Sequence, residues 1–486
     1  MARAITEEST SRLGPGLHRR YLGFTEVLGQ SVANDGPSLA IATGAGLVAI
    51  DAGAGTTWVF VAATVAIVLV ALNLSNLAKR LASAGSLYEF ARQGLGNLGG
   101  FLVGWALMLG YICGAMFSVI AVWVYLTGFL ADSNVDSSAA GWGVLTVVVA
   151  GLLAGALAFR SIRLSTRLQL GLEAASILVI LILAIVILVK NGATFDHAQW
   201  TAKGTDLHGM ILGFPLAILS FVGFESSASL GMEAKRPFSQ IPRSVLGTAI
   251  GIGVFFIFLS YVQLAGFDRH GKNIATSSAP LNDLASFYGV GTLGQAVSAG
   301  VVVSAFGIAL ACINAAARIA LTMSSDGLLP RVFARTHPTH RTPAINIIIA
   351  AALVIIIPAA LLGAHKDPIA MLTYIGEYTA LGLLIAYLGV CVATPFFLAR
   401  TNALGIGSII IAILGTVAVL AMIIGQCVPI PPNPIDLLLL GFLGWLVIGA
   451  IVYTIRLVTV GDQVIPDATT TESNPLVSPN RPSHAR

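Results

Sequence analysis

Charged side chains are scarce in this sequence. They make up 10% of its 486 residues, whereas hydrophobic residues make up 56%. A soluble globular chain averages about 25% charged residues. The composition therefore excludes an ordinary soluble protein and predicts one that crosses a membrane many times.

The sequence is also poor in cysteine and lacks a nucleotide-binding motif. The sequence has 4 cysteines, scattered through apolar segments without the spacing of a disulfide framework or a zinc site, and we expect small core residues: Cys113, Cys312, Cys391 and Cys427. No GxxxxGK[ST] motif occurs, so ATP is not expected to drive the protein directly. The first 23 residues are polar and basic, so we expect no signal peptide.

Histidine is absent from the apolar segments, or lies only at their edges. This argues against a histidine proton relay. No pair of His with Ser or Asp gathers at one end of the apolar segments, as a membrane enzyme would require. We therefore expect a protein that is not an enzyme and that has no cofactor, no metal centre and no nucleic-acid partner.

Long apolar runs dominate what is present. Stretches of about 20 such residues predict membrane helices. We predict twelve, with the following bounds: 24–49, 57–78, 98–130, 142–160, 168–190, 208–232, 244–266, 290–324, 344–364, 368–395, 404–427 and 435–458.

The basic residues set the orientation. If the N-terminus is cytoplasmic, 21 of the 26 Lys and Arg residues fall on the inner side and 5 on the outer side. Cytoplasmic loops are enriched in Lys and Arg. A wrong number of spans would scramble this alternation, so the bias predicts twelve spans with both termini in the cytoplasm.

Two predicted spans contain helix-breaking residues. Span 1 includes SVANDGPSLAIA at 31–42, and span 6 includes SFVGFESSAS at 220–229. Irregular backbone at membrane depth is tolerated only against protein or a water-filled cavity. The two spans are five apart, which is the arrangement of two five-helix inverted repeats whose first helices are broken at the midplane. The alternative is a simple kink, with Asp35 as the N-cap of a helix that starts after it.

Three blocks of sequence resemble the amino acid–polyamine–organocation (APC) transporter superfamily. They are RLASAGSLYEFARQGLGNLGGFLVGW (80–105), SFVGFESSASLGMEAKRPFSQIPRSV (220–245) and INAAARIALTMSSDGLLP (313–330). The resemblance covers residues 20 to 400. It implies transport by alternating access, a cytoplasmic membrane location, and substrates that are amino acids or related amines.

The resemblance also implies a fold class. The expected fold is an all-α polytopic membrane protein of the LeuT-like (APC) type, with twelve transmembrane helices and with helices 1 and 6 broken. The expected divisions of the chain are a cytoplasmic N-terminal segment, a first repeat, a second repeat, two further helices and a disordered tail, in the order 1–23, 24–190, 208–395, 404–458 and 466–486.

The same resemblance suggests site residues. The backbone of span 1 would meet a substrate carboxylate at Val32, Ala33, Asn34, Asp35 and Gly36. The backbone of span 6 would meet the substrate amino group at Ser220, Phe221 and Val222, with Phe221 as an aromatic lid. Glu225 matches a helix 6 glutamate that is thought to couple occupancy to movement.

Asp35 departs from the family pattern, which usually has Gly, Ser or Thr at this position. An ionised Asp35 would repel a substrate carboxylate a few ångströms away. Three roles stay open: a helix cap that points away from substrate, a counter-ion for an amine that lacks a carboxylate, and a proton site. The second role makes a polyamine or other organic cation the alternative substrate.

Other residues carry weaker predictions. Glu377 is a candidate for coupling, with a packing role near the outer end as its alternative. Glu173 is predicted to form a structural ion pair with the cluster Arg160, Arg163 and Arg167. Tyr111 and Phe306 either line the cavity or belong to the core. Arg318 and Asp326 are expected to form ion pairs at an inner gate or to anchor the interface.

The coupling ion is less constrained. Some relatives carry a helix 5 lysine that releases protons, but the matching position here is Ser176, so that mechanism has no support. A sodium site could combine span 1 carbonyls with Ser304, since hard cations prefer oxygen ligands. Proton symport or substrate exchange is the expected mode, with sodium kept as the alternative. The oligomeric state is left open.

Overall fold

The computed structural model describes residues 20–131, 140–160, 162–192, 199, 207–277, 279–427 and 435–460. Within these residues the protein is helical and contains no β-strand beyond a single bridge between Leu22 and Ala234. The segments 1–19 and 461–486 fall outside this description, so the predicted disordered tail and nearly all of the N-terminal segment are not tested.

The helices follow the apolar runs of the sequence. Their bounds are α2 Phe24–Asp35, α3 Pro37–Ala52, α4 Thr56–Ala78, α5 Leu87–Ala131, α6 Ala140–Arg160, α7 Ile162–Lys190, α9 Leu207–Leu219, α10 Pro237–Arg269, α11 Pro280–Phe287, α12 Gly291–Ser325, α13 Ala344–Gly363, α14 Pro368–Arg400, α15 Ile406–Cys427 and α16 Ile435–Val460. Short 3-10 turns include η2, Ser226–Leu230.

Among the described residues, 10 helices are long and apolar enough to cross a membrane. One of these is the 55-residue stretch Phe24–Ala78, which contains α2, α3 and α4, and the shorter apolar helix Leu207–Leu219 is counted apart. The protein is therefore a multi-pass, all-helical membrane protein, as predicted. The number of twelve spans stays a prediction.

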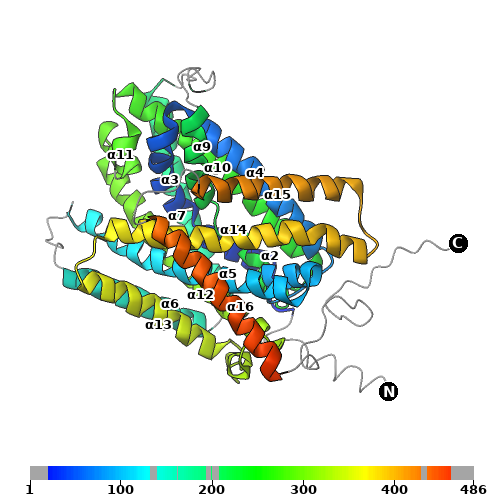
Figure 1. Ribbon diagram of the computed structural model, residues 1–486. Helices are drawn as coiled ribbons and strands as arrows, with labels where there is room; N and C mark the ends of the chain where they lie inside the picture. The colour runs from blue at the N-terminus through cyan, green and yellow to red at the C-terminus, as the bar shows by residue number, and fades with distance from the viewer. Residues whose placement is uncertain are drawn as a thin grey trace.

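Four pairs of helices that are five apart in the predicted order of spans pack against one another. α3 contacts α9, α4 contacts α10, α5 contacts α12, and α6 contacts α13. The α6–α13 pair lies along one side of the molecule, and α5 crosses the middle beside α14 (Figure 1). The helices of the two broken spans, α3 and α9, thereby contact each other and the continuous helix α4.

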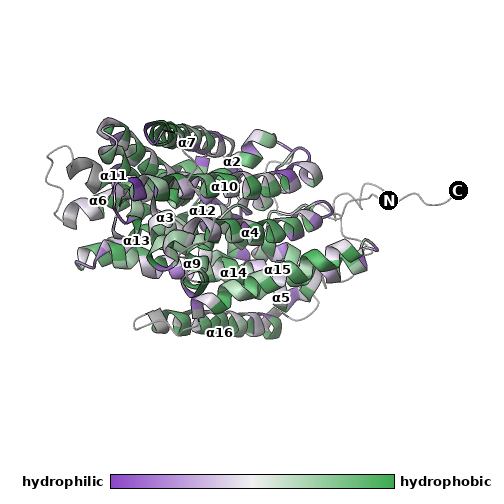
Figure 2. Cartoon of the chain, turned by 90° about the horizontal axis from the view of Figure 1, so that it is seen from above, coloured by the Kyte–Doolittle hydropathy of each residue, from purple (hydrophilic) through white to green (hydrophobic). Residues whose placement is uncertain are grey.

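The outer helices present apolar side chains to their surroundings. Hydrophobic residues run along α15 and α16 at the edge of the bundle (Figure 2), and the exposed ones include Ile410, Val417, Leu440 and Ile451. Such apolar side chains can face lipid tails, because the backbone polar groups of a helix are hydrogen-bonded within the helix.

α16 is attached to the bundle by a reciprocal pair of tryptophans. The indole N–H of Trp105 donates to the carbonyl oxygen of Trp445 at 3.0 Å, and that of Trp445 donates to the carbonyl oxygen of Trp105 at 3.2 Å. Their rings stack at 4.5 Å between centroids. Both indole donors are thus satisfied away from water, as burial in an apolar setting requires.

Candidate functional site

The first predicted span is interrupted at Gly36. α2 ends at Asp35, Gly36 takes the left-handed conformation with φ 58° and ψ 58°, and α3 begins at Pro37. The N–H of Gly36 donates to the carbonyl oxygen of Val32 at 3.0 Å. Glycine ends a helix in this conformation without steric cost, and proline fits the first position of the next helix because its missing N–H would be unpaired there.

The predicted sixth span is interrupted as well. α9 ends at Leu219, the chain then turns through Gly223, and only the 3-10 turn η2 follows before α10 begins at Pro237. Gly223 has φ +113°, a backbone conformation that L side chains rarely adopt. Both interruptions thus occur at the residues that the sequence analysis singled out.

The two interruptions pack directly on each other. The side-chain amide of Asn34 donates to the carbonyl oxygen of Gly223 at 3.4 Å, and the thiol of Cys312 on α12 donates to the side-chain oxygen of Asn34 at 3.1 Å. The N–H of Ser227 donates to the hydroxyl of Ser31 at 3.1 Å. Polar groups freed by one break are therefore paired with the other.

Gly223 should be irreplaceable at this contact. A Cβ added there would lie 2.5 to 2.7 Å from atoms of Asn34, two of them backbone atoms. Strained backbone alone costs about 1 to 3 kcal/mol, so we expect Gly223→Ala to lower the free energy of unfolding by at least that much, measured by thermal unfolding in detergent. Gly307→Ala is the control because a Cβ on this buried glycine meets nothing within 4 Å. Equal stability of the two variants would contradict the prediction.

The start of α3 is held by two other helices. The N–H of Ser38 donates to the carboxylate of Glu173 on α7 at 2.9 Å, and the N–H of Leu39 donates to the hydroxyl of Ser304 on α12 at 3.4 Å. The prediction of an ion pair between Glu173 and the arginines at 160, 163 and 167 is therefore wrong for Arg167. That arginine lies nearer the start of α7 and instead pairs with Glu26 at 2.6 Å.

Asp35 is the most unusual group of the site. Its side chain is 5% exposed, and neither carboxylate oxygen has a hydrogen-bond partner. The cap of α3 is Gly36, and no side chain donates or accepts at that cap. The helix-cap role for Asp35 is therefore wrong, and the roles of amine counter-ion and proton site stay open.

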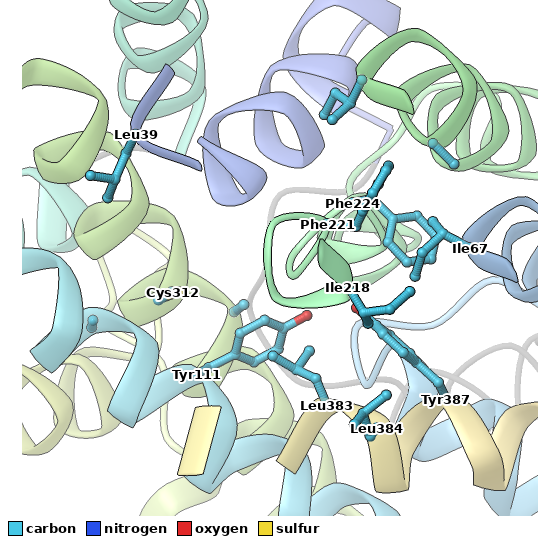
Figure 3. Close-up of a cluster of buried hydrophobic side chains, with 14 of the residues drawn as sticks. Leu39, Ile67, Tyr111, Ile218, Phe221, Phe224, Cys312, Leu383, Leu384 and Tyr387 are labelled. Carbon is cyan, nitrogen blue, oxygen red and sulfur yellow. The ribbon is translucent and has the colours of Figure 1, made fainter. Parts of the chain in front are cut away.

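Glu225 is clasped between two tyrosines. Its carboxylate is fully buried and accepts hydrogen bonds from the hydroxyl of Tyr111 on α5 at 2.6 Å and from that of Tyr387 on α14 at 2.5 Å. The two hydroxyls point from separate helices toward the looped segment after Ile218 (Figure 3). The segment that interrupts span 6 is thus connected to the two long helices beside it.

The remaining span 6 residues lie around this segment. Ser220 approaches Gly44 of α3, where an added Cβ would be 2.5 Å from the serine hydroxyl. Phe221 is fully buried, with its ring edge-on to Phe256 of α10 at 5.0 Å. Val222 is half-buried. Their contact with a substrate, and the role of Phe221 as a lid, stay predictions.

The other candidates lie further out. Phe306 is half-buried on α12. Ser176 is buried on α7 against Gly300 of α12, and no partner of its hydroxyl is found. Glu377 is half-buried on α14, about 15 Å along the helix from Tyr387 at 1.5 Å per residue. The structure therefore does not bring Glu377 to Glu225.

A second polar cluster lies around the C-terminal end of α12. Arg318 of α12 and Glu233 are 1% and 2% exposed in their side chains and pair at 2.9 Å. Asp326 pairs with Arg92 at 3.0 Å and accepts from the hydroxyl of Tyr88 at 2.7 Å. Arg318 and Asp326 thus both form ion pairs, as expected, although with partners that the sequence analysis did not name.

Several site residues escaped the sequence analysis. Tyr387, Cys312 and Glu233 are brought to the two breaks only by the tertiary packing. Tyr387 lies in the apolar run GLLIAYLGV, and this pattern predicts an aromatic residue of the core. Its one local signal is a hydroxyl within an otherwise apolar span, because a buried Tyr hydroxyl needs a partner.

Comparison with known families agrees with this geometry. A family model described as "Amino acid permease" matches residues 28–456, which is most of the chain and includes both interruptions. The chain belongs to the amino acid permease family. The resemblance noted from three short blocks is thereby confirmed over nearly the full length, and the multi-pass protein is a membrane permease rather than a protein of an unrelated membrane class.

Relatives of this permease carry differing names. The "Methylthioribose transporter" of Bacillus subtilis (strain 168) is 28% identical over 320 residues, covering 63% of this chain and 68% of that protein. The "Low-affinity putrescine importer PlaP" of Escherichia coli (strain K12) is 29% identical over 304 residues, covering 60% and 65%. The "Branched-chain amino acid permease BcaP" of Bacillus subtilis (strain 168) is 27% identical over 335 residues, covering 63% and 67%. All three are transporters, but their names point to three different substrates.

Proposed function

We propose that this permease is a secondary active transporter that moves an amino acid or a related amine across the cytoplasmic membrane by alternating access. The observation that carries the proposal is the direct contact between two interrupted helices, Gly223 against Asn34, beside buried carboxylates. Transporters of this kind bind substrate near the membrane midplane, between discontinuous helices. The site residues of span 1 and span 6 named above are proposed to line it.

The proposal includes a topology. Twelve spans, cytoplasmic termini and repeats over 24–190 and 208–395 would place the packed pairs α4–α10, α5–α12 and α6–α13 at equivalent positions of the two repeats. Their mutual contact supports this arrangement. Helices of the region 404–458 would then be additions on the outside, in keeping with their exposed apolar faces.

A second candidate within the same fold is a transporter for an amine that lacks a carboxylate, with Asp35 as the counter-ion. The observation that favours it is the buried carboxylate of Asp35 without a partner. A buried charge normally has a partner or is neutralised. The ammonium group of a substrate would supply that partner, and one relative is named for putrescine.

Ligand-induced stabilisation should decide between the two candidates. A ligand that binds only the folded protein at a hundred times its Kd raises stability by about 2.7 kcal/mol. We expect amino-group ligands from a panel of amino acids and amines to raise the melting temperature of the purified protein. If only carboxylate-free amines do so, and Asp35→Asn loses the response, Asp35 is the counter-ion. If α-amino acids stabilise both proteins equally, the first candidate stands and Asp35 serves elsewhere.

Coupling is proposed to be proton symport or exchange, with sodium as the alternative. Uptake by proteoliposomes under an imposed proton gradient, compared with an imposed sodium gradient, separates these modes. Uptake that needs only the same substrate inside the vesicle would identify exchange. A substrate that binds but is never taken up under any of the three conditions would contradict the transporter proposal.

A further inference from the structure

The backbone donors at the start of α3 are already occupied. The first residue of a helix and its neighbours offer N–H groups without partners inside the helix, and these attract anions. Pro37 has no N–H, and the N–H of Gly36 donates to Val32. The N–H of Ser38 donates to the carboxylate of Glu173 at 2.9 Å. An anion of the chain itself therefore occupies the place that a substrate carboxylate would take.

The next donors are occupied too. The N–H of Leu39 donates to the hydroxyl of Ser304 at 3.4 Å, and that of Ala40 donates to the carbonyl oxygen of Gly36 at 3.0 Å. A substrate carboxylate could reach this helix end only by displacing Glu173, which is itself 2% exposed.

The side chains around the two breaks offer little to a substrate anion. Asp35, Glu173 and Glu225 are all buried acids. In the part of the chain that the structure describes, the buried basic side chains are Arg92 and Arg318. Both pair with other carboxylates, those of Asp326 and Glu233. Among the described residues, no buried basic side chain is thus left to pair with Asp35, and an ammonium group would supply the missing partner.

We propose that Glu173 is a specificity-determining residue, whose carboxylate takes the anion-binding donors of α3 and so excludes substrates that carry an α-carboxylate. The inference rests on the proposed transport function and refines its substrate class. The favoured substrates are amines in which the carboxylate is missing, bound through their ammonium group against Asp35. Glu173 acts by holding the helix end, whereas Asp35 would contact the substrate.

Pairs of ligands that differ only by a carboxylate test this inference. Lysine with cadaverine, arginine with agmatine, and leucine with 3-methylbutylamine form such pairs. The dissociation constants are measured on the purified full chain for the wild type, Glu173→Gln and Glu173→Ala. The glutamine retains an oxygen that can accept from the N–H of Ser38 but loses the charge, so it guards against failure to fold. Asp51→Asn, an exposed acid near the other end of α3, is the control.

We expect the wild type to bind an amine at least about tenfold more tightly than its amino acid, a difference of roughly 1.4 kcal/mol. Glu173→Ala should reduce that ratio at least about tenfold by improving amino acid binding, Glu173→Gln should reduce it less, and Asp51→Asn should leave it unchanged. If the wild type binds amino acids at least as well and the Glu173 variants do not alter the ratio, this inference is overturned while the transport proposal stands. If no ligand with an amino group binds or is transported, both fall.

Discussion

Replacing both Tyr111 and Tyr387 by phenylalanine is expected to lower the rate of substrate uptake by at least about tenfold. The reason is that each hydroxyl donates a short hydrogen bond to the fully buried carboxylate of Glu225. A hydrogen bond to a charged group is worth about 1.5 to 3 kcal/mol, and removing the donor leaves the charge unpaired. Each single replacement should have an intermediate effect. Uptake of radiolabelled substrate by proteoliposomes measures the result.

Matched controls separate the hydroxyls from the rings. Tyr125→Phe on α5 and Tyr378→Phe on α14 remove hydroxyls that have no hydrogen bond to Glu225, and we expect little change. Glu225→Gln in the double phenylalanine background should recover part of the lost thermal stability, because an unpaired amide costs less than an unpaired carboxylate. Additive effects of the three substitutions would show that Tyr111, Tyr387 and Glu225 do not act as a unit. That result would contradict the prediction that their hydrogen bonds serve transport.

The positions of both helix breaks could be predicted from the sequence because their causes are local. Gly36 and Pro37 end one helix and start another wherever they stand together, and Gly223 permits the turn after α9. The count of basic residues likewise depends only on the order of the chain. These features need no knowledge of which helix packs against which.

Predictions that depended on tertiary packing fared less well. Glu173 lies early in span 5, close in the chain to Arg167, and this closeness suggested an ion pair. The packing of α7 on α2 and α3 instead places Glu26 against Arg167 and the N–H of Ser38 against Glu173. Asp35 was a reasonable cap by residue type, yet Gly36 makes the cap through the backbone and leaves the carboxylate unpaired. The partner of Glu173 thus comes from another helix, and the lack of a partner for Asp35 is likewise not visible in the local sequence.

Tyr387 shows the same limit from the other direction. No local pattern distinguishes it from a core aromatic, and it joins Glu225 from a position 162 residues away in the chain. Tyr111 was named in advance as a residue that either lines the cavity or belongs to the core, and the cavity-lining role stays a prediction. Tyr111 is 1% exposed within the core, and its hydroxyl is on Glu225.

Arg318→Met is expected to destabilise the protein by about 3 to 5 kcal/mol, because breaking a buried ion pair leaves one charge without compensation. The guanidinium of Arg318 donates to both carboxylate oxygens of Glu233, at 2.9 and 3.4 Å. The backbone carbonyl of Glu233 in turn accepts from the N–H groups of Tyr21 and Leu22 at 2.7 and 2.9 Å. Glu233, which lies in the segment between α9 and α10, is therefore bonded both to α12 and to the residues that precede α2.

The double variant Glu233→Gln/Arg318→Met should recover most of the lost stability in thermal unfolding, because it removes both charges together. If the pair is an inner gate, both variants should also open the site toward the cytoplasm. Cys312 offers a native probe, since its thiol lies against Asn34 at the break and is 4% exposed. We expect a membrane-impermeant maleimide, applied from the cytoplasmic side, to alkylate Cys312 faster in both variants than in the wild type. The variant Cys312→Ser measures how much alkylation comes from the other cysteines. If stability is recovered but the alkylation rate of Cys312 does not change in either variant, the pair Arg318–Glu233 is a structural anchor. Closure of the site toward the cytoplasm would then depend on other contacts.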